Sequence, residues 1–162
     1  MHFATTALGL LASAAAASAA SVTFVNTDGL SRSVIFTPSP GSDNIETLAI
    51  DNFQNKTVQF PDSWEGNFFA HQKGQDAKPG MLGEVRFGGW NGLTYFDVSA
   101  IVNPDDKENI KQMWPANKKS PTSGCHKFPC NDAYYLPDDV QTKVTDEVDL
   151  KCSLGTGTSP LI

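Results

Sequence analysis

Two carboxylates stand inside stretches that otherwise have the pattern of half-buried strands. Glu84 lies in residues 82–86 and Asp97 in residues 93–99, and a glycine-rich segment separates the two stretches. A glycosidase needs such a pair of carboxyl groups, one acting as acid and the other as base or nucleophile. The same pair can bind a ligand without catalysis, or serve only to stabilise the sheet. These three roles stay open at the level of the residues.

A predicted β-hairpin would position both carboxylates. Alternation with a period of two over residues 82–86 and 93–97 is the pattern of strands. Three glycines and Asn91 in residues 88–92 favour a tight reversal between them. Adjacent strands would let Glu84 and Asp97 converge, with Arg86 as a candidate ion-pair partner for either.

The rest of the chain predicts an all-β fold. Strand patterns separated by turn residues recur about every ten residues, which is typical of an antiparallel β-sandwich or flattened barrel. We expect one short helix at most, in residues 103–114, because Pro104 suits its first turn and Asp105 suits its positive end.

The ends of the chain have a different composition. Residues 1–20 predict a signal peptide, with an apolar run too short to span a bilayer and small residues at the cleavage site. A buried N-terminal helix is the alternative. We expect one β domain over residues 21–153 and a flexible tail over residues 154–162. The product would be secreted and extracellular without a membrane span, which would make Asn55 a glycosylation site.

The net charge of the chain limits the classes of partner that it can bind. The formal net charge is −6, with 12 Lys and Arg against 18 Asp and Glu. An acidic chain without a basic cluster of useful size argues against nucleic-acid binding. His71 and His126 do not stand in any metal-binding motif, so we expect no metal and no cofactor. We expect a monomer.

The three cysteines all lie in the last quarter of the chain. In an oxidising compartment two of them should pair. A bridge between Cys130 and Cys152 would stabilise the fold by about 3 kcal/mol through the loop that it closes, and we expect this pairing. Cys125 is the alternative partner, since a bridge from Cys125 to Cys130 would close a small loop. A zinc site at Cys125, His126 and Cys130 would lack a fourth ligand.

Several segments resemble thaumatin-like proteins, in the order that this family has them. They are Trp64-x-Gly66-Asn67-Phe68-Phe69-Ala70, Leu82-Gly83-Glu84-Val85, Tyr95-Phe96-Asp97-Val98-Ser99 and the stretch from Cys130-Asn131-Asp132-Ala133-Tyr134 to Cys152. The sequence is also similar to small secreted fungal proteins that elicit a hypersensitive response in plants. The resemblance implies a thaumatin-like core without the cysteine-rich second lobe.

The resemblance also implies a reduced acidic cleft. Glu84 and Asp97 match acidic positions of the family, whereas Asn67 and His71 stand where it has arginines and Thr94 where it has an aspartate. Trp90, on the predicted turn, is the aromatic residue that we expect to be exposed. We therefore take these residues, Thr94 excepted, as the candidate binding face.

The leading functional hypothesis is a non-enzymatic secreted fungal elicitor or effector, recognised at the plant or cell-wall interface. A protein that binds or weakly hydrolyses β-1,3-glucan is the first alternative, so the expected partner is a cell-wall polysaccharide or a plant receptor. An antifungal, membrane-permeabilising protein is the second alternative, and the net charge of −6 weighs against it.

Overall fold

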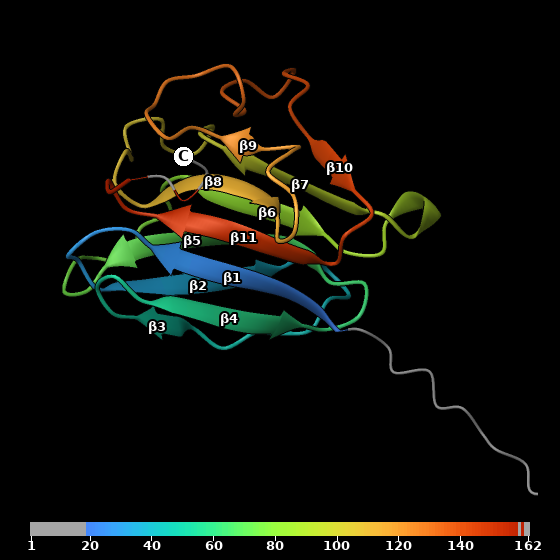
Figure 1. Ribbon diagram of the computed structural model, residues 1–162, viewed down its shortest axis with the longest axis horizontal. Helices are drawn as coiled ribbons and strands as arrows, with labels where there is room; N and C mark the ends of the chain where they lie inside the picture. Colours follow the sequence, from blue (N-terminus) through green and yellow to red (C-terminus); the bar gives the residue numbers. More distant parts are fainter. Residues whose placement is uncertain (1–18, 159, 161–162) are drawn as a thin grey trace, which may run out of the picture.

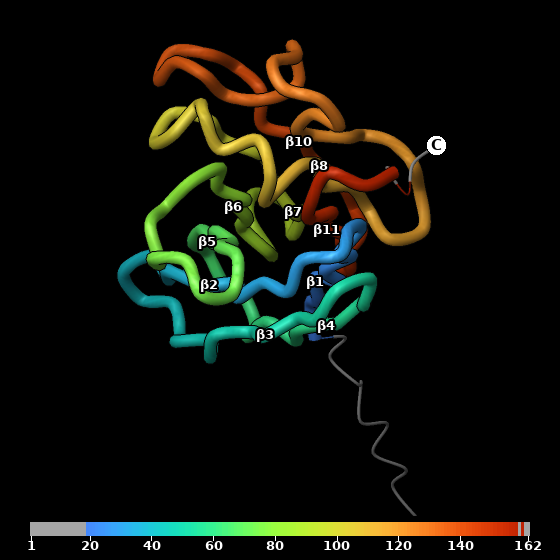
Figure 2. The backbone as a smooth tube through the Cα atoms, turned by 90° about the vertical axis from the view of Figure 1, so that its left-hand side faces the viewer, coloured from blue at the N-terminus to red at the C-terminus, as the bar shows by residue number. Residues whose placement is uncertain are grey.

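Two β-sheets packed face to face form the molecule in a computed structural model, which describes residues 19–158 and 160 (Figure 1). The five-stranded sheet contains, in spatial order, β4 (Asn55–Phe60), β1 (Ala20–Asn26), β11 (Asp149–Leu154), β8 (Ile110–Pro115) and β9 (Ser123–Gly124). The six-stranded sheet contains β10 (Lys143–Thr145), β7 (Thr94–Ser99), β6 (Leu82–Arg86), β5 (Glu65–Gln72), β2 (Arg32–Pro38) and β3 (Leu48–Ile50). Figure 2 shows the two layers after a turn of 90°.

Alternating strand residues fill the space between the sheets. Phe24 of β1 is fully buried and packs edge-on against Phe36 of β2 and Phe68 of β5, with ring centroids 5.9 and 5.1 Å away. These contacts cross from one sheet to the other. Buried aromatic pairs of this kind contribute about 1 kcal/mol each beyond the area that they bury.

The all-β sandwich predicted from the sequence is confirmed, and over residues 19–158 the sheets do not close into a barrel. One detail differs from a purely antiparallel arrangement. The first and last strands, β1 and β11, pair in parallel, with Ser21 opposite Asp149 and Asn26 opposite Leu154. The five-stranded sheet is therefore mixed.

The predicted short helix in residues 103–114 is wrong. The segment forms turns and then enters β8. The side chain of Asp106 accounts for the turns, because its Oδ2 accepts a hydrogen bond from the Met81 amide at 3.0 Å and its Oδ1 accepts one from Asn109 Nδ2 at 2.8 Å. A 3₁₀ turn, η1 (Trp90–Gly92), lies instead in the predicted hairpin reversal. No helix within the described ranges is long and apolar enough to cross a membrane.

The two predicted domain boundaries lie close to the ends of the described residues. The predicted signal peptide lies almost wholly outside the described residues, but Ala20 already belongs to β1. At the other end Leu154 is fully buried in β11, and the Thr156 amide donates to Asp28 Oδ2 at 2.8 Å. The tail predicted to be flexible from residue 154 is thus held in place through Thr156.

The expected Cys130–Cys152 bridge is wrong. The disulfide joins Cys125 and Cys130, whose Cα atoms are 5.8 Å apart, and Cys152 is a free, buried thiol. Cys152 faces the core from the middle of β11, opposite Phe24 and Met113, whereas the other two cysteines share one loop. The bridge also excludes the zinc site that was the alternative for Cys125 and Cys130.

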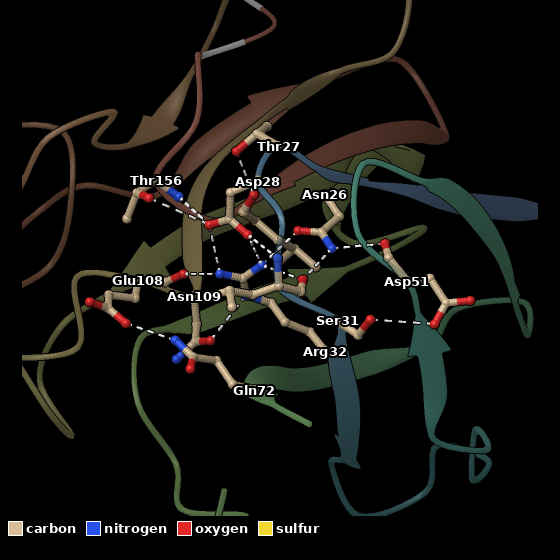
Figure 3. A network of polar contacts seen from close by, with 12 residues as sticks. Asn26, Thr27, Asp28, Ser31, Arg32, Asp51, Gln72, Glu108, Asn109 and Thr156 are labelled. Carbon is tan, nitrogen blue, oxygen red and sulfur yellow. Dashed lines mark hydrogen bonds and ion pairs between the residues drawn. The ribbon is translucent and has the colours of Figure 1, made fainter. Parts of the chain in front are cut away.

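A buried arginine joins several turns at one end of the sandwich (Figure 3). Arg32 has no exposed side-chain surface and forms an ion pair with Asp28 at 2.7 Å. Its guanidinium also donates to Asn26 Oδ1 at 2.6 Å and to the Glu108 carbonyl at 2.8 Å. Burial alone would raise the pKa of Asp28, but the hydrogen bonds that its carboxylate accepts from Arg32 and from the Thr156 and Leu30 amides lower it to about 2. The cluster is structural, since the Nε, Nη1 and Nη2 groups of Arg32 all donate to oxygen atoms within the fold.

Candidate functional site

A row of polar side chains crosses the outer face of the six-stranded sheet. Strand register places Asn67 of β5 opposite Glu84 of β6, and Glu84 opposite Asp97 of β7. Side chains directly opposite each other on neighbouring strands share one face and lie close together. The predicted hairpin thus forms, and Glu84 and Asp97 converge.

A shallow groove of about 250 Å³ runs along this row. Its walls come from three strands, β5, β6 and β7, and from two loops. The lining residues are Ser39, Glu65, Gly66, Asn67, Glu84, Val85, Arg86, Tyr95, Asp97 and Thr142. Both carboxylates thus line the groove, although Asp97 is only 7% exposed.

Asp97 is the most perturbed group in the groove. Burial, followed by the charge of Glu84 and a hydrogen bond with that carboxyl, raises the pKa of Asp97 from 3.8 to about 7, although a hydrogen bond from Thr142 opposes the rise. Asp97 Oδ2 accepts that bond from Thr142 Oγ1 at 3.3 Å. Its Oδ1 is buried without a donor among the described residues.

The other residues predicted for the binding face divide between two places. Asn67 lies in the groove, whereas His71 lines a separate cavity of about 450 Å³ beside the loop that precedes β8. Trp90 is 76% exposed at the hairpin turn, and Tyr95 Oη, on the groove wall, donates to its carbonyl at 3.4 Å. The row therefore extends to Trp90 and does not include His71.

Arg86 does not neutralise the acidic pair. It forms an ion pair with Glu65 at 3.4 Å, across β5 and β6. The sequence-based suggestion that Arg86 pairs with Glu84 or Asp97 is wrong, because Glu65 occupies the position opposite Arg86. Half-exposed pairs of this kind contribute little to stability.

Comparison with known proteins finds relatives from fungi. No family model matches it. The chain is 59% identical over 142 residues to the antigenic protein SchS21 of Stachybotrys chartarum, covering 88% of this chain and 99% of that one. The chain belongs to the SchS21 family.

The fold of this SchS21 family member is also that of a solved elicitor. The crystal structure of the protein elicitor MoHrip2 from Magnaporthe oryzae superimposes with a TM-score of 0.63 over 85% of this chain and 99% of that one. The sequences are 15% identical, so the likeness shows a shared fold. The thaumatin-like resemblance stays a prediction, because neither relative carries that name.

The geometry of the acidic pair bears on catalysis. The carboxyl groups of a retaining glycosidase lie about 5 Å apart, and those of an inverting one lie farther apart. Glu84 and Asp97 lie directly opposite each other on β6 and β7, so both carboxyl groups stand side by side on one face of the sheet.

Thr142 and Tyr95 are among the groove residues that the sequence did not predict. Thr142, which precedes β10, hydrogen-bonds both Asp97 and the hydroxyl of Tyr134, the latter at 2.8 Å. Tyr95 also lines the groove, although it was not among the predicted site residues. The alternation along β7 does indicate this position for Tyr95, because residues two apart in a strand face the same side of the sheet and Tyr95 lies two residues before Asp97. Nothing in the sequence around Thr142 indicates that it approaches a strand 45 residues away.

Proposed function

We propose that this SchS21 family member is a secreted, non-enzymatic fungal elicitor or effector, recognised at the plant or cell-wall interface. The observation that carries the proposal is the likeness in fold to a protein elicitor over 99% of that protein's chain. The 59% identical relative is named as an antigen, which is also a protein recognised by another organism. Both names describe recognition of the protein by another organism and neither describes an enzyme.

The recognition surface in this proposal is the acidic groove together with the turn that carries Trp90. A tryptophan that is 76% exposed gives a large apolar contact beside the polar row. Tryptophan is among the residues that most often dominate binding energy at protein interfaces. The hydrogen bond from Tyr95 to the Trp90 carbonyl makes the turn continuous with the groove.

Infiltration of the purified protein into leaves tests the proposal. We expect cell death or induction of defence genes with the native protein and neither with heat-denatured protein. Trp90→Ala should weaken the response, whereas Phe53→Ala, which removes another exposed aromatic from a different turn, should not. If the folded protein gives neither response over a wide range of concentrations, the elicitor function is refuted.

Binding of β-1,3-glucan is a second candidate, and one observation favours it. Asp97 Oδ1 is a buried acceptor without a donor among the described residues, and it borders an open groove. The hydroxyl groups of a sugar can supply that donor, and Asn67 beside it can both donate and accept.

A pull-down on insoluble β-1,3-glucan tests this candidate, with release of reducing sugar measured in the same samples. We expect binding by the native protein, weaker binding by Glu84→Gln and Asp97→Asn, and no release of sugar. Unchanged binding in both variants would exclude a role for these carboxylates, and absence of binding by the native protein would exclude the candidate.

A further inference from the structure

A pocket lined by basic residues lies outside the acidic groove. We call it the basic pocket; it has a volume of about 430 Å³. Its lining residues are Lys107, Lys111, His126, Lys127, Phe128 and Thr156. No Asp or Glu is among these six, although the protein as a whole has a net charge of −6. The basic pocket therefore concentrates positive charge on an otherwise acidic protein.

Lys111, at the start of β8, is the most constrained of these cations. It is only 5% exposed, and its Nζ donates to the Lys107 carbonyl at 2.7 Å and lies 5.3 Å from the ring centroid of Phe128. Burial lowers the pKa of Lys111, while the charges of Asp106 and Glu108 oppose this effect. Within residues 19–158 the lysines of the basic pocket form no salt bridge. An anion in the pocket would stabilise the buried ammonium group.

The disulfide holds one wall of the basic pocket in place. The bridge between Cys125 and Cys130 encloses His126, Lys127 and Phe128 in a short loop. The Cys125 amide donates to the Lys111 carbonyl at 2.8 Å, which ties this loop to β8. Phe128 is 6% exposed and packs into the hydrophobic core, which holds the loop in place. The positive groups are thus positioned before a ligand arrives, which reduces the entropy cost of binding.

We propose that the basic pocket binds an oxyanion, a carboxylate or a phosphate, on a small organic molecule. The three ammonium groups supply the charge that attracts the oxyanion, and the Phe128 ring supplies an apolar surface for the carbon skeleton. A volume of about 430 Å³ is within the usual range for small-molecule sites. The proposal is independent of the elicitor function, because it uses different residues on a different part of the surface.

NMR titration of the oxidised protein at low ionic strength tests the proposal. The probes are inorganic phosphate, glucose 6-phosphate and galacturonate, with glucose as the neutral control. We expect saturable shifts of the amides of Lys107, Lys111 and Lys127 with at least one organic anion, and none with glucose. The relative affinities of the three anions will separate phosphate recognition from carboxylate recognition.

Charge-removing variants locate the site. Lys107→Gln/Lys127→Gln should weaken binding about tenfold, at roughly threefold for each exposed lysine. Lys73→Gln/Lys78→Gln is the matched control, because it removes two exposed lysines that do not line the basic pocket. Absence of saturable binding by every anion, equal binding of glucose, or equal weakening in the two double variants would each refute the proposal.

Discussion

Replacing Asp97 by Asn should make the protein more stable near neutral pH. Asp97 is 7% exposed, and burial together with Glu84 raises its pKa from 3.8 to about 7. The folded protein therefore holds this proton more tightly than the unfolded chain does. The resulting stabilisation is complete below the unfolded pKa and is lost as the pH rises through about 7. Asn has no proton to lose, and its amide can donate to Glu84.

The size of the effect follows from the two pKa values. A rise from 3.8 to about 7 corresponds to about 4 kcal/mol over the full window, at about 1.4 kcal/mol for each unit. Between about pH 5 and about pH 8, the wild-type protein should lose about 2.5 kcal/mol of this stabilisation. Asp97→Asn should not show this loss, so the two proteins should diverge as the pH rises.

Urea unfolding at pH values between these limits measures the effect. Trp64 and Trp114 are 1% and 3% exposed, so their fluorescence will change on unfolding. The difference in unfolding free energy between the wild type and Asp97→Asn removes the contributions of all other titrating groups. Glu84→Gln should reduce the pH dependence, because it removes the charge next to Asp97.

Asp62→Asn is the matched control, since Asp62 is exposed and does not line the groove. It should leave the pH dependence of the wild type unchanged. A difference between wild type and Asp97→Asn that stays constant from about pH 5 to about pH 8 would refute the reasoning, because the Asp97 carboxyl would then titrate alike in both states.

Three further predictions concern the framework. Arg32→Met should cost about 3 kcal/mol in urea unfolding, because it leaves the Asp28 charge without its partner in a largely buried position; a loss below about 1 kcal/mol would contradict this role. Gly124→Ala should prevent folding, as judged by circular dichroism, because this residue has a φ of +85° and a Cβ there would collide with the Lys111 carbonyl; a folded variant of normal stability would be inconsistent with this contact. Alkylation of the native protein without reductant should label no cysteine, and alkylation in urea should label Cys152 alone; peptide mapping that finds the label on another cysteine would disprove the pairing.

The hairpin that carries the acidic pair was predictable because local rules determine it. Alternation over residues 82–86 and the glycines of the reversal both indicate it, and register then brings Glu84 next to Asp97. The cost of burying Asp97 was not predictable in the same way. It depends on Thr142 and on neighbouring strands, which are distant in sequence.

Two errors had a common physical origin. Residues around Asp105 have the composition of a helix start, but Asp106 forms its hydrogen bonds with Met81 and Asn109 in a turn. The expected disulfide was chosen for the size of its loop, whereas the side-chain direction of Cys152 decided the outcome. In both cases tertiary contacts outweighed a local preference.

The parallel pairing of β1 with β11 affects how the chain can fold during synthesis. A ribosome delivers residues from the N-terminus onward, so β1 emerges long before residues 149–154, which lie between it and β8. The five-stranded sheet therefore cannot close until residues 149–154 have been synthesised. A chain that ended before Asp149 would leave the facing edges of β1 and β8 unpaired, and such edges can pair with other copies and aggregate.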